Sequence, residues 1–407
     1  MDKKKKRCLR GAVIVLCVLI ALGAAGLFLR AQLFVRSGSC GVEGAEDSVV
    51  WRVDLGGTLT VSGDGEMMDN LMYQIMFAYE AAFHTSVDFE SAIRAIVVEE
   101  GVKNIGENAF VGFSRVRSVS LPESVERIAF RAFAGLSRVK SIRIPAGTRA
   151  VGTEAFAGCY ALREIAVDEN NPVYTAEDGI LMNKEKTELL AYPAGRTDGE
   201  YAVPEFVSRI GDSAFCCCAN LKSVEIPDTV TEIGKNAFDN CSRLETVRLP
   251  EKLTQLQDFA FVDCAALRSI ELPDSVEKCG NSVFQGCTSL SFVRLSAKLD
   301  TVAGLMFEGC GSLRSIELPA GIRTVATEAF ALSGLEEIVL PEGLTTIGMR
   351  AFSQCESLKK ITVPATVTKI GAGAFAQCLN LTSIDYAGTE EQWQNATHGE
   401  DVGFDKF

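Results

Sequence analysis

The chain has 407 residues, a formal net charge of −13 and 47% hydrophobic residues, so it holds enough apolar material for a folded core. The acidic balance argues against a nucleic-acid-binding surface, because such a surface needs clustered lysine and arginine. Only two histidines are present, His84 and His398. Histidine is the usual general base and the commonest metal ligand, so this scarcity argues against His-dependent catalysis and most zinc sites.

The first thirty residues predict a membrane segment. Gly11–Leu29 carries no charge and lies between Arg10 and Arg30, and at ~1.5 Å per residue a helix of this length spans roughly 28 Å, close to the hydrocarbon thickness of a bilayer. The basic run Lys3–Arg7 precedes it, so the positive-inside rule places the N-terminus in the cytoplasm and the rest outside. A cleaved secretory signal is the alternative. Its apolar core is shorter, ~7–15 residues, so an uncleaved signal-anchor is favoured.

A repeat occupies most of the remaining chain. Taking Leu221 as position 1 of a 23-residue unit, leucine recurs at position 1, aliphatic residues at positions 4 and 6, proline at 7, glycine at 14, Ala-Phe at 17 and 18, and cysteine at 21. Nine of the eleven prolines fall at position 7, and a register that holds nearly every proline indicates a true internal repeat. The phenylalanines at position 18 are Phe110, Phe133, Phe156, Phe215, Phe238, Phe261, Phe284, Phe307, Phe330, Phe352 and Phe375.

Each repeated residue type predicts a local structure. Positions 4 and 6 have the period of two that places side chains on the inner face of a short strand, and the proline at position 7 ends that strand. The glycine at position 14, as in Gly211, Gly234, Gly348 and Gly371, allows a tight or positive-φ bend. Ala-Phe then opens a short helical or 3₁₀ turn, and its phenylalanine ring is expected to fill the layer between coils. Because one such coil cannot bury its apolar side alone, the coils must stack. The fold class predicted is an α/β leucine-rich-repeat solenoid of about eleven 23-residue coils with a parallel β-strand row.

One insertion and two caps complete the expected architecture. The gap between Phe156 and Phe215 contains 36 extra residues, about 162–197, that predict an inserted β-hairpin with strands at 179–182 and 188–192. The hairpin either binds a partner or covers a change in the curvature of the solenoid, and the second interpretation is favoured. At the N-terminal end we expect a β-hairpin around Gly56-Gly57 and a helix over Asn70–Phe83, and at the C-terminal end a capping box at 389–392 that folds Trp393 over the last coil.

The predicted organisation follows in chain order. It consists of a cytoplasmic basic tail (1–10), a transmembrane signal-anchor (11–29), a linker (30–47), an N-terminal cap module (48–92), the solenoid (93–385) and a C-terminal cap and tail (386–407).

The repeated motif resembles one family. The run P-x-x-V-x-x-I-G-x-x-A-F-x-x-C-x-x-L-x-x-I, found at 227–247 and 364–384, is similar to that of the BspA-like leucine-rich-repeat surface proteins of bacteria. The segments 48–67, 171–195 and 386–393 resemble the N-terminal hairpin, inserted hairpin and closing segment that accompany those repeats. The resemblance implies an exported solenoid tied to adhesion, host matrix proteins or neighbouring cells, and it supplies no catalytic residues.

Cysteines form the first candidate for chemistry. Eight of the fourteen occupy position 21: Cys159, Cys218, Cys241, Cys264, Cys287, Cys310, Cys355 and Cys378. Metal ligands need short paired spacings, and these lie too far apart in sequence, so a stack of buried thiols is expected. Cys40, Cys216 and Cys217 remain, either as reactive thiols or as partners in an intermolecular bond.

Charges on the strand row form the second candidate. Position 5 carries, on five successive coils, Glu225, Arg248, Glu271, Arg294 and Glu317. In-register parallel strands would place each carboxylate between guanidinium groups. This row is either an electrostatic docking stripe or a self-neutralising ladder, and the ladder is favoured because exposed ion pairs add little affinity.

The sequence therefore predicts a non-catalytic binding protein, tethered to the cell membrane, with its repeat domain outside the cell and a protein or glycan ligand. No metal, cofactor or nucleic-acid partner is expected. Two other functions stay open: an envelope spacer without a specific ligand, and a surface carbohydrate-active or peptide-cleaving enzyme.

Overall fold

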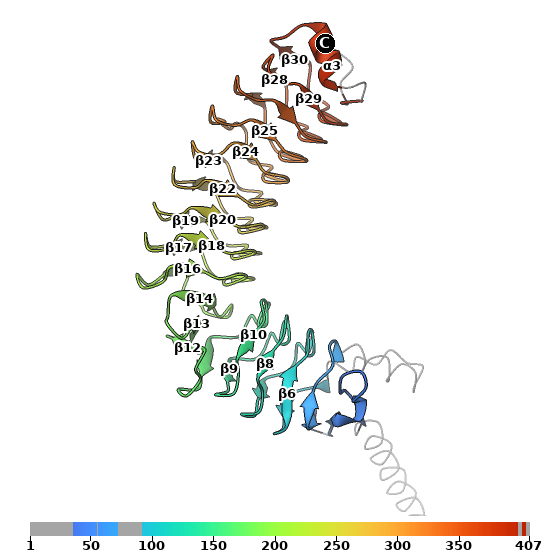
Figure 1. Cartoon of the computed structure of the whole chain (residues 1–407), viewed down its shortest axis with the longest axis vertical. Helices are drawn as coiled ribbons and strands as arrows, with labels where there is room; N and C mark the ends of the chain where they lie inside the picture. The colour runs from blue at the N-terminus through green and yellow to red at the C-terminus, as the bar shows by residue number, and fades with distance from the viewer. Residues whose placement is uncertain (1–35, 55, 72–91, 398–400, 404–407) are drawn as a thin grey trace, which may run out of the picture.

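The computed structural model describes residues 36–54, 56–71, 92–397 and 401–403, and these form an elongated stack of coils (Figure 1). The predicted anchor at 11–29 and most of the helix predicted over Asn70–Phe83 lie outside this description. Among the described residues, no helix has the length and apolar character needed to cross a bilayer.

The predicted row of parallel strands is present. It is formed at positions 3 to 6 of the coils, where β17 buries Val224 and leaves Glu225 exposed, and Pro227 follows just beyond the strand end. Its strands are β5 (Ala95–Val98), β7 (Ser118–Ser120), β9 (Ser141–Ile144), β11 (Glu164–Val167), β15 (Glu200–Ala202), β17 (Ser223–Glu225), β19 (Thr246–Arg248), β21 (Ser269–Glu271), β23 (Phe292–Arg294), β26 (Glu337–Val339), β28 (Lys360–Val363) and β30 (Ser383–Tyr386).

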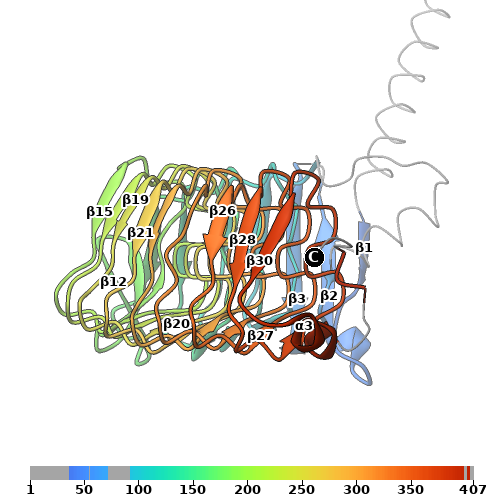
Figure 2. The same ribbon diagram turned by 90° about the horizontal axis from the view of Figure 1, so that it is seen from above.

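A second row of strands, not predicted, runs along another wall of the coils (Figure 2). Its members occupy positions 12 and 13, and Ile233 in β18 pairs in parallel with Ile210 of the preceding coil and Leu256 of the next. They are β6 (Val102–Ile105), β8 (Arg127–Ile128), β10 (Ala150–Val151), β16 (Arg209–Ile210), β18 (Glu232–Ile233), β20 (Gln255–Leu256), β22 (Lys278–Cys279), β24 (Thr301–Val302), β25 (Thr324–Val325), β27 (Thr346–Ile347) and β29 (Lys369–Ile370).

Positions 16 to 20 form the third wall of each coil, and here the prediction of a helical or 3₁₀ turn is wrong. Here the N–H groups of Asn236, Phe238 and Asn240 donate to carbonyls of the next coil at 3.1, 2.8 and 3.0 Å. Asn236 and Asn240 have φ angles of 53° and 57°, and left-handed residues recur at these same two positions, 16 and 20, in the other coils. The segment is therefore a series of turns hydrogen-bonded to its neighbours. Residues 93–385 contain no α-helix, so the fold class is a β-solenoid and not the α/β solenoid predicted.

The glycine at position 14 is needed for close approach and not for a positive φ angle. Gly234 and Gly371 are not among the left-handed residues. A Cβ atom on Gly234 would lie 2.8 Å from the backbone nitrogen of Asp212, and one on Gly371 would lie 2.5 Å from that of Met349. A side chain at either of these two glycines would force the neighbouring coil to shift.

The core is a column of phenylalanine rings. Phe238 lies between Phe215 and Phe261, with ring centroids 4.7 and 4.9 Å away and interplanar angles of 6° and 3°. Phe284 is likewise fully buried between two rings. The prediction that these rings fill the layer between coils is confirmed.

Separate elements cover the two ends of the stack. At the N-terminal end, β2 (Val49–Val53) and β3 (Thr58–Gly63) form an antiparallel hairpin that buries Trp51, with β1 (Arg36–Ser39) antiparallel to β2 and β3 parallel to β5. The 3₁₀ helix η1 (Glu46–Ser48) precedes this hairpin, and β4 (Gly65–Glu66) pairs with β6. At the C-terminal end, α3 (Glu390–Thr397) is opened by reciprocal hydrogen bonds between Thr389 and Gln392, and Trp393 packs edge-on against Tyr386 at 5.3 Å.

Truncating one ring of the column should destabilise the whole stack. We expect Phe284→Ala to lower the free energy of unfolding by about 3–5 kcal/mol, because it leaves a cavity between two coils. Phe292→Ala, in the next coil and 53% exposed, serves as the control and should change it by less than about 1 kcal/mol. Urea denaturation followed by circular dichroism measures both. Equal effects of the two substitutions would contradict the column.

Candidate functional site

The inserted segment interrupts the stacking of the coils. After β11 the chain forms β12 (Tyr174–Glu177), β13 (Ile180–Asn183) and β14 (Glu188–Ala191), an antiparallel meander with one strand more than the hairpin predicted. The meander is built into the solenoid wall, because β14 pairs in parallel with β16. β10 belongs to a different sheet. The buried core accordingly divides into two clusters, with Leu181 in the N-terminal one and Ile180 and Met182 in the C-terminal one.

Tyr192 takes the phenylalanine position of the interrupted coil. Its ring lies 5.1 Å from that of Phe215, and its N–H donates to the carbonyl of Ala214 at 2.7 Å, as Phe215 does to Ala237 in the next coil. The thiol of Cys218 donates to the carbonyl of Tyr192 at 3.7 Å. Tyr192 also lies 23 residues before Phe215, a spacing by which the sequence signals this role although we did not predict it.

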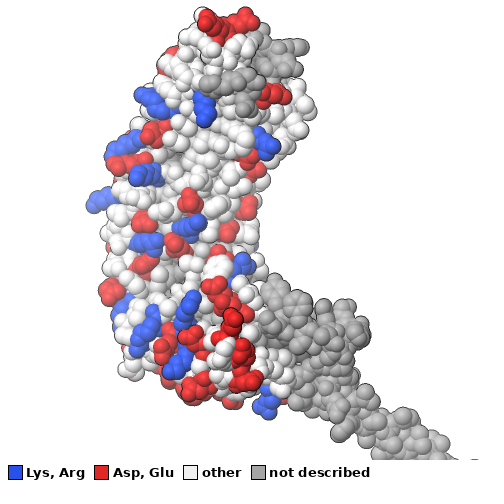
Figure 3. Space-filling view, turned by 45° about the vertical axis from the view of Figure 1, so that its right-hand side comes forward, with Lys and Arg blue, Asp and Glu red and all other residues white. Residues whose placement is uncertain are grey.

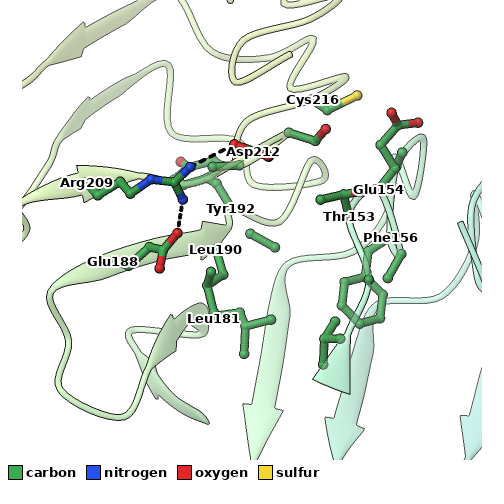
Figure 4. Close-up of a pocket in the computed structure, with 17 residues that line it drawn as sticks. Thr153, Glu154, Phe156, Leu181, Glu188, Leu190, Tyr192, Arg209, Asp212 and Cys216 are labelled. Carbon is green, nitrogen blue, oxygen red and sulfur yellow. Dashed lines mark hydrogen bonds and ion pairs between the residues drawn. The ribbon is translucent and has the colours of Figure 1, made fainter. Parts of the chain in front are cut away.

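A cleft of about 160 Å³ lies between the two halves of the ring column. On one side is the coil of Phe156, and on the other are Tyr192 and the turn at Asp212 (Figure 4). Phe156 is 8% exposed whereas Phe133 and Phe215 are fully buried, because Phe156 has a stacking partner on only one side. Leu181, Leu190 and Ala155 complete the apolar lining.

The charged groups of the cleft are tied to one arginine. The guanidinium of Arg209 pairs with Glu188, with Asp212 at 2.9 Å and with Glu232 at 3.4 Å, and Glu154 on the opposite side lies 3.7 Å from Arg131. Glu188 and Asp212 thus share one guanidinium partner. In a glycosidase, by contrast, the two carboxyl groups flank the scissile bond of the substrate.

Cysteines border the cleft and line the core. All twelve cysteines in the described ranges are free thiols. Each thiol of the position-21 column donates a hydrogen bond to the carbonyl of the phenylalanine or tyrosine 26 residues earlier, as Cys264 does to Phe238 at 3.2 Å. For Cys355 the acceptor lies 25 residues earlier. The column is buried except for the half-buried Cys378. Cys40 is also buried, and burial raises the pKa of its thiol to about 12. It is therefore unsuited to reaction.

Cys216 and Cys217 form an adjacent pair with 3.5 Å between their sulfur atoms. Cys216 lines the cleft (Figure 4). The pKa of Cys217 is lowered because the thiol of Cys216 donates a hydrogen bond to it. Burial, together with the charge of Glu154, raises the pKa of the nearby Asp239 carboxyl to about 6.

The charged row on the strands is broken into pairs. Arg248 lies 3.2 Å from Glu225, and Arg294 lies 3.3 Å from Glu271. The expected contact between Arg248 and Glu271 is not formed, since β19 and β21 belong to different sheets. Glu317 lies where the row has no strand, and it makes no ion pair among the described residues. Over the face shown in Figure 3, basic and acidic side chains are interspersed along most of the length, as expected for local neutralisation.

Comparisons with known proteins agree with the repeat solenoid. The family model described as a BspA type leucine rich repeat region matches in six copies, over residues 81–195, 208–336 and 324–398. The chain belongs to the BspA-type leucine-rich-repeat family. A search of curated proteins gave no significant match.

Two solved structures are similar in fold to this chain. A leucine-rich repeat protein from Eubacterium ventriosum is 24% identical with a TM-score of 0.58, and the match covers 87% of this chain and 96% of that one. The pneumococcal vaccine antigen PcpA is 24% identical with a TM-score of 0.50, over 68% of this chain and 64% of that one. At this identity the likeness concerns the fold.

No metal centre is built into the described part of this BspA-type solenoid, where no three histidine, cysteine, aspartate or glutamate side chains gather closely enough to hold an ion. The described surface therefore offers two places of interest: the charged strand row, which the sequence indicated, and the cleft at the insertion, which it did not.

The thiols of Cys217 and Cys279 should differ in reactivity. We expect iodoacetamide to modify Cys217 in the native protein well before Cys279, because the thiolate is the reactive form. Both side chains are half-buried, but burial raises the pKa of Cys279 to about 12 while that of Cys217 is lowered. Mass spectrometry of tryptic peptides gives the order, and labelling in urea removes the difference. Faster modification of Cys279 would contradict the assignment.

Asp239 should make stability depend on pH. Its raised pKa means that the folded state holds the proton more tightly than the unfolded chain does, so the charged form destabilises the fold above pH ~6 and has no such effect below pH ~4. Asp239→Asn should therefore raise the urea midpoint at about pH 7.5, and this gain should shrink as the pH falls through that window. Asp300→Asn, an exposed carboxylate in a distant coil, is the control. A gain that is constant with pH would refute the assignment.

Proposed function

We propose that the chain is an exported, membrane-tethered binding protein that engages proteins or glycans at the cell surface through the strand surface of its solenoid. The strand surface consists of the outward side chains of the first strand row, β5 to β30. The observation that carries this proposal is the BspA-type solenoid itself, whose exposed strand row extends from β5 to β30. Solenoids bind through extended surfaces, by summing many modest contacts.

The composition of the strand surface supports the proposal. It combines charged pairs, such as Arg248 with Glu225, with exposed apolar side chains, since Phe292 and Val339 are 53% and 67% exposed. Two shallow hollows open beside the charged row, and Arg248 lines both. Exposed arginines and aromatic rings are the residue types most often found at the centres of protein interfaces.

The proposed location rests on the sequence. The uncharged run 11–29 follows the basic residues 1–10, which favours a single membrane anchor with the solenoid outside. We expect protease added to intact cells to degrade the solenoid while an epitope placed before residue 11 survives. Degradation only after the cells are lysed would contradict the tether.

Capture by immobilised ligands tests the binding function. The full chain is presented to a panel of extracellular matrix proteins and glycans, and we expect saturable capture of one class. The double substitution Arg248→Gln and Arg294→Gln should weaken this capture at least tenfold, whereas Arg350→Gln, on the turn wall, should leave it unchanged. The changes in stability should be small because all three side chains are exposed. No capture by any ligand would favour a spacer instead.

A further inference from the structure

We infer that the cleft between Phe156 and Tyr192 is a docking slot for an extended peptide segment of a partner protein, which inserts one aromatic side chain into the gap of the ring column. This inference deepens the proposed binding function by assigning it a second site and a ligand chemistry. It follows from three observations on the residues that line the cleft: unused backbone donors, a missing ring and an excess of carboxylates.

Backbone donors face the cleft without acceptors. In the regular coils the N–H groups of positions 16 and 18 donate to carbonyls of the next coil, as those of Asn236 and Phe238 do. The same positions in the coil before the cleft are Glu154 and Phe156, and their N–H groups find no acceptor among the described residues. The regular acceptors are carbonyls two residues apart on one segment, so an extended peptide offers matching acceptors.

The cleft also lacks one ring. Successive rings in the column lie 4.7 to 6.1 Å apart, but Phe156 and Tyr192 form no ring contact with each other, and both line the cleft (Figure 4). A volume of about 160 Å³ matches that of apolar cavities that hold a benzene ring, ~150 Å³. The apolar walls supplied by Leu181 and Leu190 suit an aromatic side chain.

The charge of the lining selects the flanking residues of the peptide. Glu154, Glu188 and Asp212 line the cleft together with Arg209, and a second arginine, Arg131, lies 3.7 Å from Glu154. An excess of carboxylates at a partly exposed rim favours a ligand with lysine or arginine beside the aromatic residue. An acidic peptide would be repelled.

The experiment uses the full chain and one designed probe. The probe is an acetylated and amidated pentapeptide with phenylalanine at its centre, serine on both sides and lysine at both ends. A second peptide has alanine in place of phenylalanine. We expect calorimetric titration to show binding of the first peptide at least tenfold tighter than the second, because only the first can bury a ring.

Two variants place the binding at the cleft. Ala157→Trp puts an indole into the cleft and should weaken binding of the phenylalanine peptide at least tenfold. Gln285→Trp is the matched control, since Gln285 is also half-buried and holds the same repeat position away from the cleft. Leu190→Phe fills the cleft more gently, so a folding defect in one variant leaves the other as a test. Thermal unfolding verifies that each variant is folded.

Hydrogen exchange reads out the backbone contacts. The phenylalanine peptide should slow amide exchange in residues 153–157 and leave Phe284 unchanged, because its N–H already donates to Met306 at 3.1 Å. Equal affinity for the two peptides, absence of binding, or unchanged affinity in both filled variants would overturn the inference. So would protection of 153–157 by a glycan and not by the peptide. Failure here with continued ligand capture by Ala157→Trp would leave the proposed surface function standing.

Discussion

Each coil of this protein depends on its neighbours to cover both its rings and its backbone. The rings of Phe215, Phe238 and Phe261 stack almost face to face, and the N–H groups of the turn wall donate from coil to coil. A single coil would leave its apolar side in water and its polar groups without partners, so neither contact exists without stacking. The stacking of coils therefore explains why the chain is elongated and why its ends need separate caps.

Because each coil covers the backbone donors and apolar surface of the next, a break in stacking leaves such groups uncovered. At the insertion, β13 separates the two core clusters, and Phe156 is left with a ring on one side only. The backbone donors and apolar surface that other coils use internally are then turned toward solvent. A cleft of this kind needs no special catalytic residue to become a binding site, because it presents the recognition pattern that the protein already uses between its own coils.

The charged residues contribute to recognition in a different way from the apolar ones. On the strand surface they form small exposed groups, such as Arg294 with Glu271 and Asp274, and beside the cleft Arg209 contacts three carboxylates. Exposed pairs contribute little to stability, typically below ~1 kcal/mol. They suit the selection and orientation of a partner, while burial of apolar groups supplies most of the affinity. This division agrees with binding through many contacts along a repeat protein.

The sequence by itself determined the coil, its register and its buried residues, because the phenylalanine, proline and cysteine positions repeat with a fixed period that only a stacked structure satisfies. It also located the insertion. Only the tertiary structure decided the second strand row, the left-handed residues and the cleft. Leu305 and Phe259 adopt positive φ angles that their own preferences disfavour, since hydrogen bonds to the neighbouring coils impose them. Likewise, the unpaired donors of Glu154 and Phe156 arise from how the meander displaces a whole wall, which no local pattern encodes.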